Sequence, residues 1–227
     1  MGTKLHAYGE AILNVYKEKS DEDKPDISFI PVPDSPKAIW VPQIVHRLVK
    51  EEGYEVAKTE LLLYSLATKI SGQSDIFLRK GYVDGDTAVN KVMAKKKFPR
   101  HVEYNYMIYD WKFLQDKIKK KGFYNVRTRK YKTMLGPFKY LDDCNWIHYS
   151  IQLAIYQALS GAPERITEKV LIAVTDDGYE FVPAYPMFVY WDEEGNIQAV
   201  YETWGGKWYI SEYDQLVVDK PEWLPAI

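Results

Sequence analysis

Three side chains that could bind and use a metal ion lie on two apolar stretches of the sequence. Asp75 lies in Lys69–Leu78 (KISGQSDIFL), and Asp110 and Lys112 lie in Tyr106–Phe113 (YMIYDWKF). Both stretches have the length and the β-branched and aromatic content that predict strands. Side chains alternate between the two faces of a strand, so Asp110 and Lys112 share one face. If the two strands are neighbours, two carboxylates and one ammonium converge, and carboxylate oxygens are the ligands that hard divalent cations prefer.

The same three residues also have a simpler interpretation. Asp75 could cap a turn where its strand ends, and Asp110 and Lys112 could form an ion pair at a strand edge. A carboxylate inside an apolar strand is costly unless it is paired or bound to a cation, and both interpretations satisfy this condition. The D-x-K triplet is too short to decide between them, so the rest of the chain must be considered.

Two helices are predicted before the first of these strands, and one is predicted after the second. Apolar residues at helical spacing predict a helix over Lys4–Lys19, and Pro42 begins a second helix that continues to about Glu52. A proline-rich segment, Ser20–Lys37, connects them in an extended form. The third helix covers Asn145–Leu159, with one apolar stripe and a glycine just after its end.

The other predicted elements are strands and connections. Tyr54–Ser65 predicts a strand, Gly81–Arg100 predicts a loop or an insertion, and the sequence from Lys169 onward predicts strands separated by glycine turns. This order predicts an α/β protein with a central mixed β-sheet flanked by helices. We divide it into an N-terminal helix and connector (1–38), a core with a basic insertion (39–175), and a β-rich C-terminal extension of the same domain (176–227).

The composition is that of a folded protein with one large domain. Of the 227 residues, 46% are hydrophobic and 27% are charged, which excludes a disordered chain. No stretch approaches the roughly 18 apolar residues of a membrane-spanning helix, and the N-terminus lacks the apolar core of a signal peptide. The single cysteine, Cys144, excludes an internal disulfide and a cysteine-built zinc or iron–sulfur site. These features predict a cytoplasmic protein without a membrane partner.

The basic residues are concentrated in one part of the chain. Residues 91–139 contain 15 of the 30 Lys and Arg residues but three acids, although the net charge of the whole chain is −2. Aromatic residues are interspersed in the basic run from Lys117 to Lys132. Such a run is often a solvated surface, but clustered basic and aromatic side chains also bind nucleic acids. We therefore expect DNA contacts from the following side chains: Lys119, Lys120, Lys121, Arg127, Arg129 and Lys130.

Taken together, the motifs resemble the RecB-type exonuclease branch of the PD-(D/E)XK nuclease superfamily and are similar to its small phage-encoded members. The resemblance covers roughly residues 42–175. It rests, in order, on a helix, a strand, Gly72-x-x-Asp75, a hydrophobic strand ending in Asp110-Trp111-Lys112, and a helix bearing Gln152-x-x-x-Tyr156. It implies a restriction-endonuclease-like core, with an insertion between the two strands that carry the carboxylates.

The resemblance implies a metal-dependent reaction. Asp75, Asp110 and the main-chain carbonyl of Trp111 would hold Mg²⁺ or Mn²⁺, which polarises a phosphodiester and activates a bound water molecule. Lys112 would orient or help to deprotonate that water and would offset charge in the transition state.

Four further residues receive roles from the same resemblance. His46 is the best match to an upstream helical histidine and would be a further metal ligand, and Glu60 resembles a recurrent acid of the family. Gln152 and Tyr156 would lie beside the active site and contact DNA or orient the centre. Each has a structural alternative: His46 could be a core-edge histidine, Glu60 a solvated strand residue, and Gln152 and Tyr156 the border of the apolar stripe.

The expected function is a metal-dependent DNA nuclease. The leading interpretation is an exonuclease that serves DNA replication, recombination or degradation in a phage or bacterium, with replication or recombination proteins as further partners. Two alternatives stay open: a catalytically silent nucleic-acid-binding or assembly protein on the same scaffold, and a sequence-specific endonuclease. The sequence has no G-x-x-x-x-G-K-[ST] motif, so it does not indicate a nucleotide-driven motor.

Overall fold

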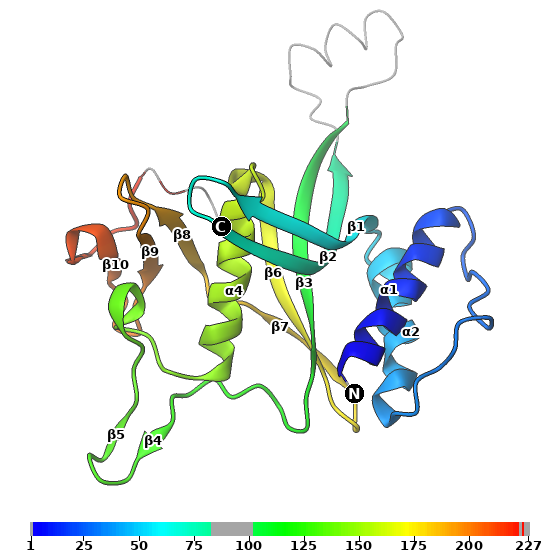
Figure 1. Cartoon of the computed structure of the whole chain (residues 1–227), viewed down its shortest axis with the longest axis horizontal. Coiled ribbons are helices and arrows are strands. Elements are labelled where there is room, and N and C mark those ends of the chain that lie inside the picture. The colour runs from blue at the N-terminus through cyan, green and yellow to red at the C-terminus, as the bar shows by residue number, and fades with distance from the viewer. Residues whose placement is uncertain (1, 83–101, 223, 225–227) are drawn as a thin grey trace, which may run out of the picture.

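The centre of the protein is a five-stranded sheet with the strand order β1-β2-β3-β6-β7 (Figure 1). The structure is a computed structural model that describes residues 2–82, 102–222 and 224. β3 and β6 pair in parallel, and the other neighbours pair antiparallel, so the predicted mixed sheet of an α/β protein is confirmed. The strands are β1 (Glu55–Ser65), β2 (Ile70–Tyr82), β3 (Glu103–Phe113), β6 (Ile166–Val174) and β7 (Tyr179–Pro183).

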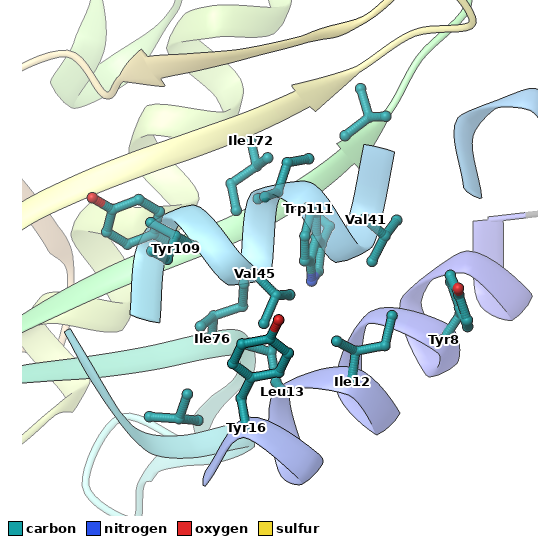
Figure 2. Packing of buried hydrophobic residues seen from close by; sticks show 14 of the residues in the cluster. Tyr8, Ile12, Leu13, Tyr16, Val41, Val45, Ile76, Tyr109, Trp111 and Ile172 are labelled. Atoms are coloured by element: carbon teal, nitrogen blue, oxygen red, sulfur yellow. The ribbon is translucent and has the colours of Figure 1, made fainter. Parts of the chain in front are cut away.

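One face of this sheet is covered by the two N-terminal helices, α1 (Gly2–Glu18) and α2 (Trp40–His46). Figure 2 shows Ile12 of α1 and Val41 of α2 beside Trp111 of β3. Burying one valine or isoleucine side chain stabilises the fold by roughly 1.5–3 kcal/mol. α1 is therefore an integral part of the core rather than an appendage to it.

The other face of the sheet is covered by α4 (Asn145–Leu159), whose bounds are those predicted from its apolar stripe. The opposite side of α4 packs on a second, four-stranded antiparallel sheet, so this helix lies between two sheets (Figure 1). Among the described residues, no helix is long and apolar enough to cross a membrane. The second sheet consists of β8 (Met187–Trp191), β9 (Ile197–Glu202), β10 (Trp208–Ile210) and β11 (Gln215–Val217).

Between β3 and α4 the chain forms a short hairpin of β4 (Tyr124–Asn125) and β5 (Lys130–Tyr131), here called the β4–β5 arm. Asn125 Oδ1 accepts hydrogen bonds from the main-chain N–H groups of Arg127 and Thr128, which fixes the turn. The arm projects from the body of the protein (Figure 1). Within residues 2–82 and 102–222, the other helical turns are Pro36–Ile39, Arg47–Glu51, Gly136–Phe138, Pro163–Arg165 and Ser211–Tyr213.

Several predicted boundaries are shifted: α1 begins at Gly2 rather than Lys4, β3 at Glu103 rather than Tyr106, and β6 at Ile166 rather than Lys169. The second helix begins at Trp40, two residues before Pro42, and its last part is a π-helical turn rather than a continuing α-helix. β2 continues to Tyr82, because its ladder with β3 extends to Gly81 and Tyr82, which were expected to begin the insertion. The rest of the predicted insertion, residues 83–100, lies outside the described residues.

β2 passes very close to α4 at Gly72. A Cβ atom at this position would overlap ring carbon Cε1 of Tyr156 on α4, so a residue with a side chain does not fit without movement. The Tyr156 ring is itself buried in the core between α4 and the sheet. The glycine of the Gly72-x-x-Asp75 motif therefore has a packing role, since it lets the strand cross the helix three residues before Asp75.

Gly72→Ala should lower the free energy of unfolding by about 1–3 kcal/mol, the usual cost of overpacking a core position. The added methyl group forces the Tyr156 ring to move. Urea denaturation followed by tryptophan fluorescence measures the change. Gly178→Ala is the matched control, because a Cβ atom there has no neighbour within 4 Å. The cost should shrink in a Tyr156→Ala background, and an equal cost in both backgrounds would show that the ring is not the obstacle.

Candidate functional site

Asp75 and Asp110 lie side by side on β2 and β3. The antiparallel ladder pairs Ile76 with Tyr109, and one further step sets Asp75 opposite Asp110. Both side chains are largely buried, with 11% and 3% of their surface exposed. Asp75 Oδ2 accepts a hydrogen bond from the main-chain N–H of Trp111 at 2.9 Å. The predicted adjacency of the two strands is confirmed.

Lys112 lies on the same face of β3 as Asp110, as the alternation of side chains predicts. Its ammonium group forms an ion pair with Asp110 Oδ2 and donates a hydrogen bond to Gln152 Oε1 at 3.1 Å. It also lies 4.5 Å from the centre of the Tyr149 ring, within the range of a cation–π interaction. The amine is therefore held in place by an acid, an amide and a ring.

α4 supplies the residues that hold Lys112. Gln152 and Tyr156 are four residues apart and share one face of the helix. Gln152 Nε2 donates a hydrogen bond to the Tyr156 hydroxyl at 2.7 Å, while its Oε1 accepts the hydrogen bond from Lys112. Burial raises the pKa of Tyr156, so its hydroxyl stays protonated at neutral pH. The structure thus brings both predicted α4 residues to the pair of Asp110 and Lys112.

Burial raises the pKa of both carboxyl groups. For Asp75 the hydrogen bond from Trp111 opposes this effect, and for Asp110 the positive charge of Lys112 opposes it. The charge of a neighbouring carboxylate also raises each pKa: Asp75 raises that of Asp110, and Glu60 raises that of Asp75. Asp110 Oδ2 has no regular hydrogen-bond donor in the described part of the chain, although the Lys112 ammonium contacts it. A bound cation would relieve this excess of buried negative charge.

A histidine that the sequence analysis did not single out also lies at the site. His6 of α1 places Nδ1 3.8 Å from Asp75 Oδ2, and its ring contacts that of Phe113 with 5.2 Å between centroids. Burial lowers the pKa of His6, which favours the neutral imidazole that can bind a metal ion. α1 comes this close because Gly9 leaves room for the indole of Trp111, which lies 3.1 Å from where a Cβ atom would be.

His46, which was predicted as a metal ligand, lies elsewhere, and that prediction is wrong. Its Nδ1 is 3.3 Å from the hydroxyl of Tyr16, between α1 and α2. Tyr16 follows His6 by ten residues on α1, which corresponds to about 15 Å along a helix. The physical reason is the packing of α2, which buries Val45 against the core and turns its last residue toward the far end of α1.

Glu60 is an acid at the border of the site. The register of β1 and β2 sets it opposite Asp75. Burial raises the pKa of Glu60, and the nearby charges of Glu10 and Asp110 raise it further. Its φ of 48° lies in the left-handed region, which is uncommon for a residue with a side chain. Glu60 is half-buried at this position, and its role in the site stays a prediction.

The donor set fits one small, hard cation that keeps part of its water. Asp75 and Asp110 provide carboxylate oxygens, and Mg²⁺ is commonly bound through one or two carboxylates while it keeps several water molecules. Within residues 2–82, 102–222 and 224, no three His, Cys, Asp or Glu side chains form a ready-made ligand group. Two carboxylates of this kind are a donor set that a partly hydrated Mg²⁺ or Mn²⁺ can use.

The predicted DNA-contacting residues form two exposed groups. One group lies in the irregular segment after β3, and the other lies on the β4–β5 arm. In the part of the chain that the structure describes, none of them forms an ion pair with an acid. The first group is Lys119, Lys120 and Lys121, and the second is Arg127, Arg129 and Lys130.

Two neighbours of the site had sequence signals that could have found them. Tyr149 precedes Gln152 by three residues and therefore shares its helical face, which places an aromatic ring beside whatever Gln152 contacts. His6 precedes Gly9 by three residues, and a glycine on the buried face of a helix marks a close approach to another element. The sequence near His6 and Gly9 does not show which element approaches the helix.

The raised pKa values predict how stability depends on pH. A carboxyl group whose pKa is higher in the folded protein than in the unfolded chain makes folding less favourable once the unfolded form is ionised. The unfolded value is 3.8 and the folded values are about 6, so the free energy of unfolding should fall as pH rises through this interval. Urea denaturation at pH 5 and pH 8 without divalent cations measures the fall, and Asp110→Asn should reduce it.

Asp214→Asn is the control for this measurement. The hydrogen bond from Lys139 lowers the pKa of Asp214, so its contribution to stability is lost only below its unfolded value, outside the measured interval. An identical pH dependence in the wild type and in Asp110→Asn would contradict the assignment of the effect to the buried carboxylates.

Comparison with known proteins gives no relative from which a function could be transferred. The chain matches no protein-family model, and it matches neither a curated protein nor a solved structure. Any functional conclusion therefore rests on the residues of the site itself.

Proposed function

We propose that this protein is a metal-dependent DNA nuclease that hydrolyses phosphodiester bonds. One observation carries the proposal: two buried carboxylates, Asp75 and Asp110, lie beside the amine of Lys112 on neighbouring strands. Buried negative charge attracts a divalent cation, and an amine next to that cation is placed for acid–base work. The resemblance of the motifs to RecB-type exonucleases supports the same function.

The metal would be held by Asp75, Asp110 and the main-chain carbonyl of Trp111. When bound, Mg²⁺ or Mn²⁺ would polarise a phosphodiester oxygen and lower the pKa of a water molecule. The N–H of Trp111 keeps Asp75 oriented for this task. His6 and Glu60 border the same space, where they would complete the environment of the cation.

Lys112 would have two tasks. Its amine would orient the attacking water and take part in its deprotonation, and its charge would offset the negative charge that develops on the phosphate. Gln152 fixes the amine through its oxygen, and Tyr156 fixes the orientation of the Gln152 amide by accepting a hydrogen bond from its nitrogen. Both α4 residues therefore act through Lys112 rather than on the substrate.

The basic groups would bind the DNA backbone. The segment after β3 leads directly from the strand of Lys112 to the β4–β5 arm, so the charges follow the candidate site along the chain. The finer proposal is an exonuclease that acts in replication, recombination or degradation of phage or bacterial DNA, together with proteins of those processes. A catalytically silent binding protein would bind DNA without cleaving it, and a sequence-specific endonuclease would cut circular duplexes at fixed sites.

Asp110→Asn and Lys112→Ala should both lower the rate of DNA cleavage by about 100-fold or more, for different reasons. Asparagine keeps the shape of the side chain but removes the charge that attracts Mg²⁺, so metal binding should weaken. Lys112→Ala keeps both carboxylates and should still bind Mg²⁺. The measurement uses end-labelled linear and circular DNA, single- and double-stranded, with Mg²⁺ or Mn²⁺, and calorimetry for metal binding.

Asp214→Asn and Lys139→Ala are matched controls, because these residues form an exposed ion pair beside the second sheet. Both should keep full activity. Ca²⁺ should support DNA binding with little cleavage, since its larger and looser shell activates water poorly. Robust cleavage by either site variant, or by the wild type in excess EDTA, would remove this site from the mechanism. Binding without cleavage under every condition would favour the silent binding protein.

Neutralising the β4–β5 arm should weaken DNA binding and reduce its dependence on salt. For the triple change Arg127→Gln, Arg129→Gln and Lys130→Gln, the slope of log affinity against log salt should become shallower by about 0.9 for each lost phosphate contact on duplex DNA. Fluorescence anisotropy at several salt concentrations gives the slope. The control variant carries Gln at Lys19, Lys24 and Lys50, at the α1–α2 side of the protein. Equal slopes in the wild type and the arm variant would show that the arm does not contact DNA.

A further inference from the structure

A row of aromatic rings leads away from Lys112 along α4. The Lys112 amine lies 4.5 Å from the centre of the Tyr149 ring. Trp146 precedes Tyr149 by three residues and is therefore its neighbour on the helix surface. The Trp146 ring lies 6.2 Å from the ring of Trp204, between centroids. We call Tyr149, Trp146 and Trp204 the aromatic track.

Trp204 is the most exposed ring of the track. Its exposed fraction is 56%, which is high for so large an apolar side chain. It lies in the turn between β9 and β10, which is closed by a hydrogen bond from the Thr203 N–H to the Lys207 carbonyl at 2.7 Å. Its ring contacts the Tyr185 ring, with 5.2 Å between centroids. Trp204 is therefore held in place while more than half of its surface is open to a ligand.

Positive charge lies along the same surface. The Lys120 amine is 5.4 Å from the centre of the Trp146 ring. The main-chain N–H of Trp146 donates a hydrogen bond to the Lys119 carbonyl at 3.2 Å, which fixes the basic segment beside the start of α4. Aromatic faces combined with a basic backbone groove are how proteins bind single-stranded nucleic acids, because every unpaired base can stack on a ring. A base-paired duplex does not offer these faces.

We propose that the aromatic track and Lys120 bind the unpaired bases of a single-stranded DNA end and lead that strand to Lys112. The inference rests on the proposed nuclease function and specifies its substrate: a single strand, or the separated end of a duplex. Continuity with the candidate site and the adjacent positive charge identify DNA as the occupant. If the rings of the track only shield Tyr185 from water, the protein should bind unpaired and paired DNA without preference.

The test compares affinity for an unpaired thymidine oligonucleotide with affinity for a blunt duplex of the same length, by fluorescence anisotropy in Ca²⁺. Trp204→Leu keeps an apolar group over Tyr185 but removes the flat ring. It should lower the ratio of single-strand to duplex affinity by about 5- to 150-fold, the loss expected for one stacked base. Trp204→Phe should keep most of the ratio. Tyr213→Ala, an exposed ring outside the track, should leave it unchanged.

A second measurement uses the unaltered protein and does not depend on the folding of a variant. Photocrosslinking with a 5-iodouracil oligonucleotide should label Trp204 or Trp146, identified by mass spectrometry. Labelling only outside the track would overturn the proposal, as would an unchanged affinity ratio in a folded Trp204→Leu protein. If the wild type cleaves DNA while the ratio is unchanged, the track fails and the nuclease stands. If the ratio falls but no substrate is cleaved, the nuclease fails and the track stands.

Discussion

The structure depends on the placement of two like charges next to each other inside a sheet. Asp75 and Asp110 meet because β2 and β3 pair in a register that sets them opposite each other. Removal from water and mutual repulsion both disfavour the ionised forms. The surrounding contacts compensate for part of this cost, since the Trp111 N–H binds one carboxylate and Lys112 contacts the other. The compensation is incomplete, and groups with such raised pKa values are concentrated at the functional sites of proteins.

The sequence was sufficient for the parts of the site that depend on local patterns. The strands of Asp75, Asp110 and Lys112 have the composition of buried strands, and alternation placed Lys112 on the face of Asp110. The bounds of α4 follow from one apolar stripe, so Gln152 and Tyr156 had to share a helical face. Each of these inferences uses residues only a few positions apart.

The sequence was not sufficient where the contact joins distant residues. His6 meets Asp75 because α1 docks on β3 through Gly9 and Trp111. Gly9 signals a close approach to another element, but nothing in the sequence shows that this element is β3. His46 is the best match to the upstream helical histidine of the resemblance, but its position in the sequence does not decide which helix covers the end of a strand. For the same reason the glycine turns predicted the C-terminal strands without showing that β7 joins the main sheet and β8 the second one.

α4 is the element that connects these parts. The face with Gln152 and Tyr156 orients the amine of Lys112, and the opposite face, with Ile147 and Ala154, is packed on the second sheet. A side chain can act as a positioned acid or base only if its neighbours are themselves held by packing. The second sheet fixes the helix, the helix fixes Gln152, and Gln152 fixes the amine. Elements far from the two carboxylates therefore contribute to the geometry of the site, because a closely packed helix transmits position from one face to the other.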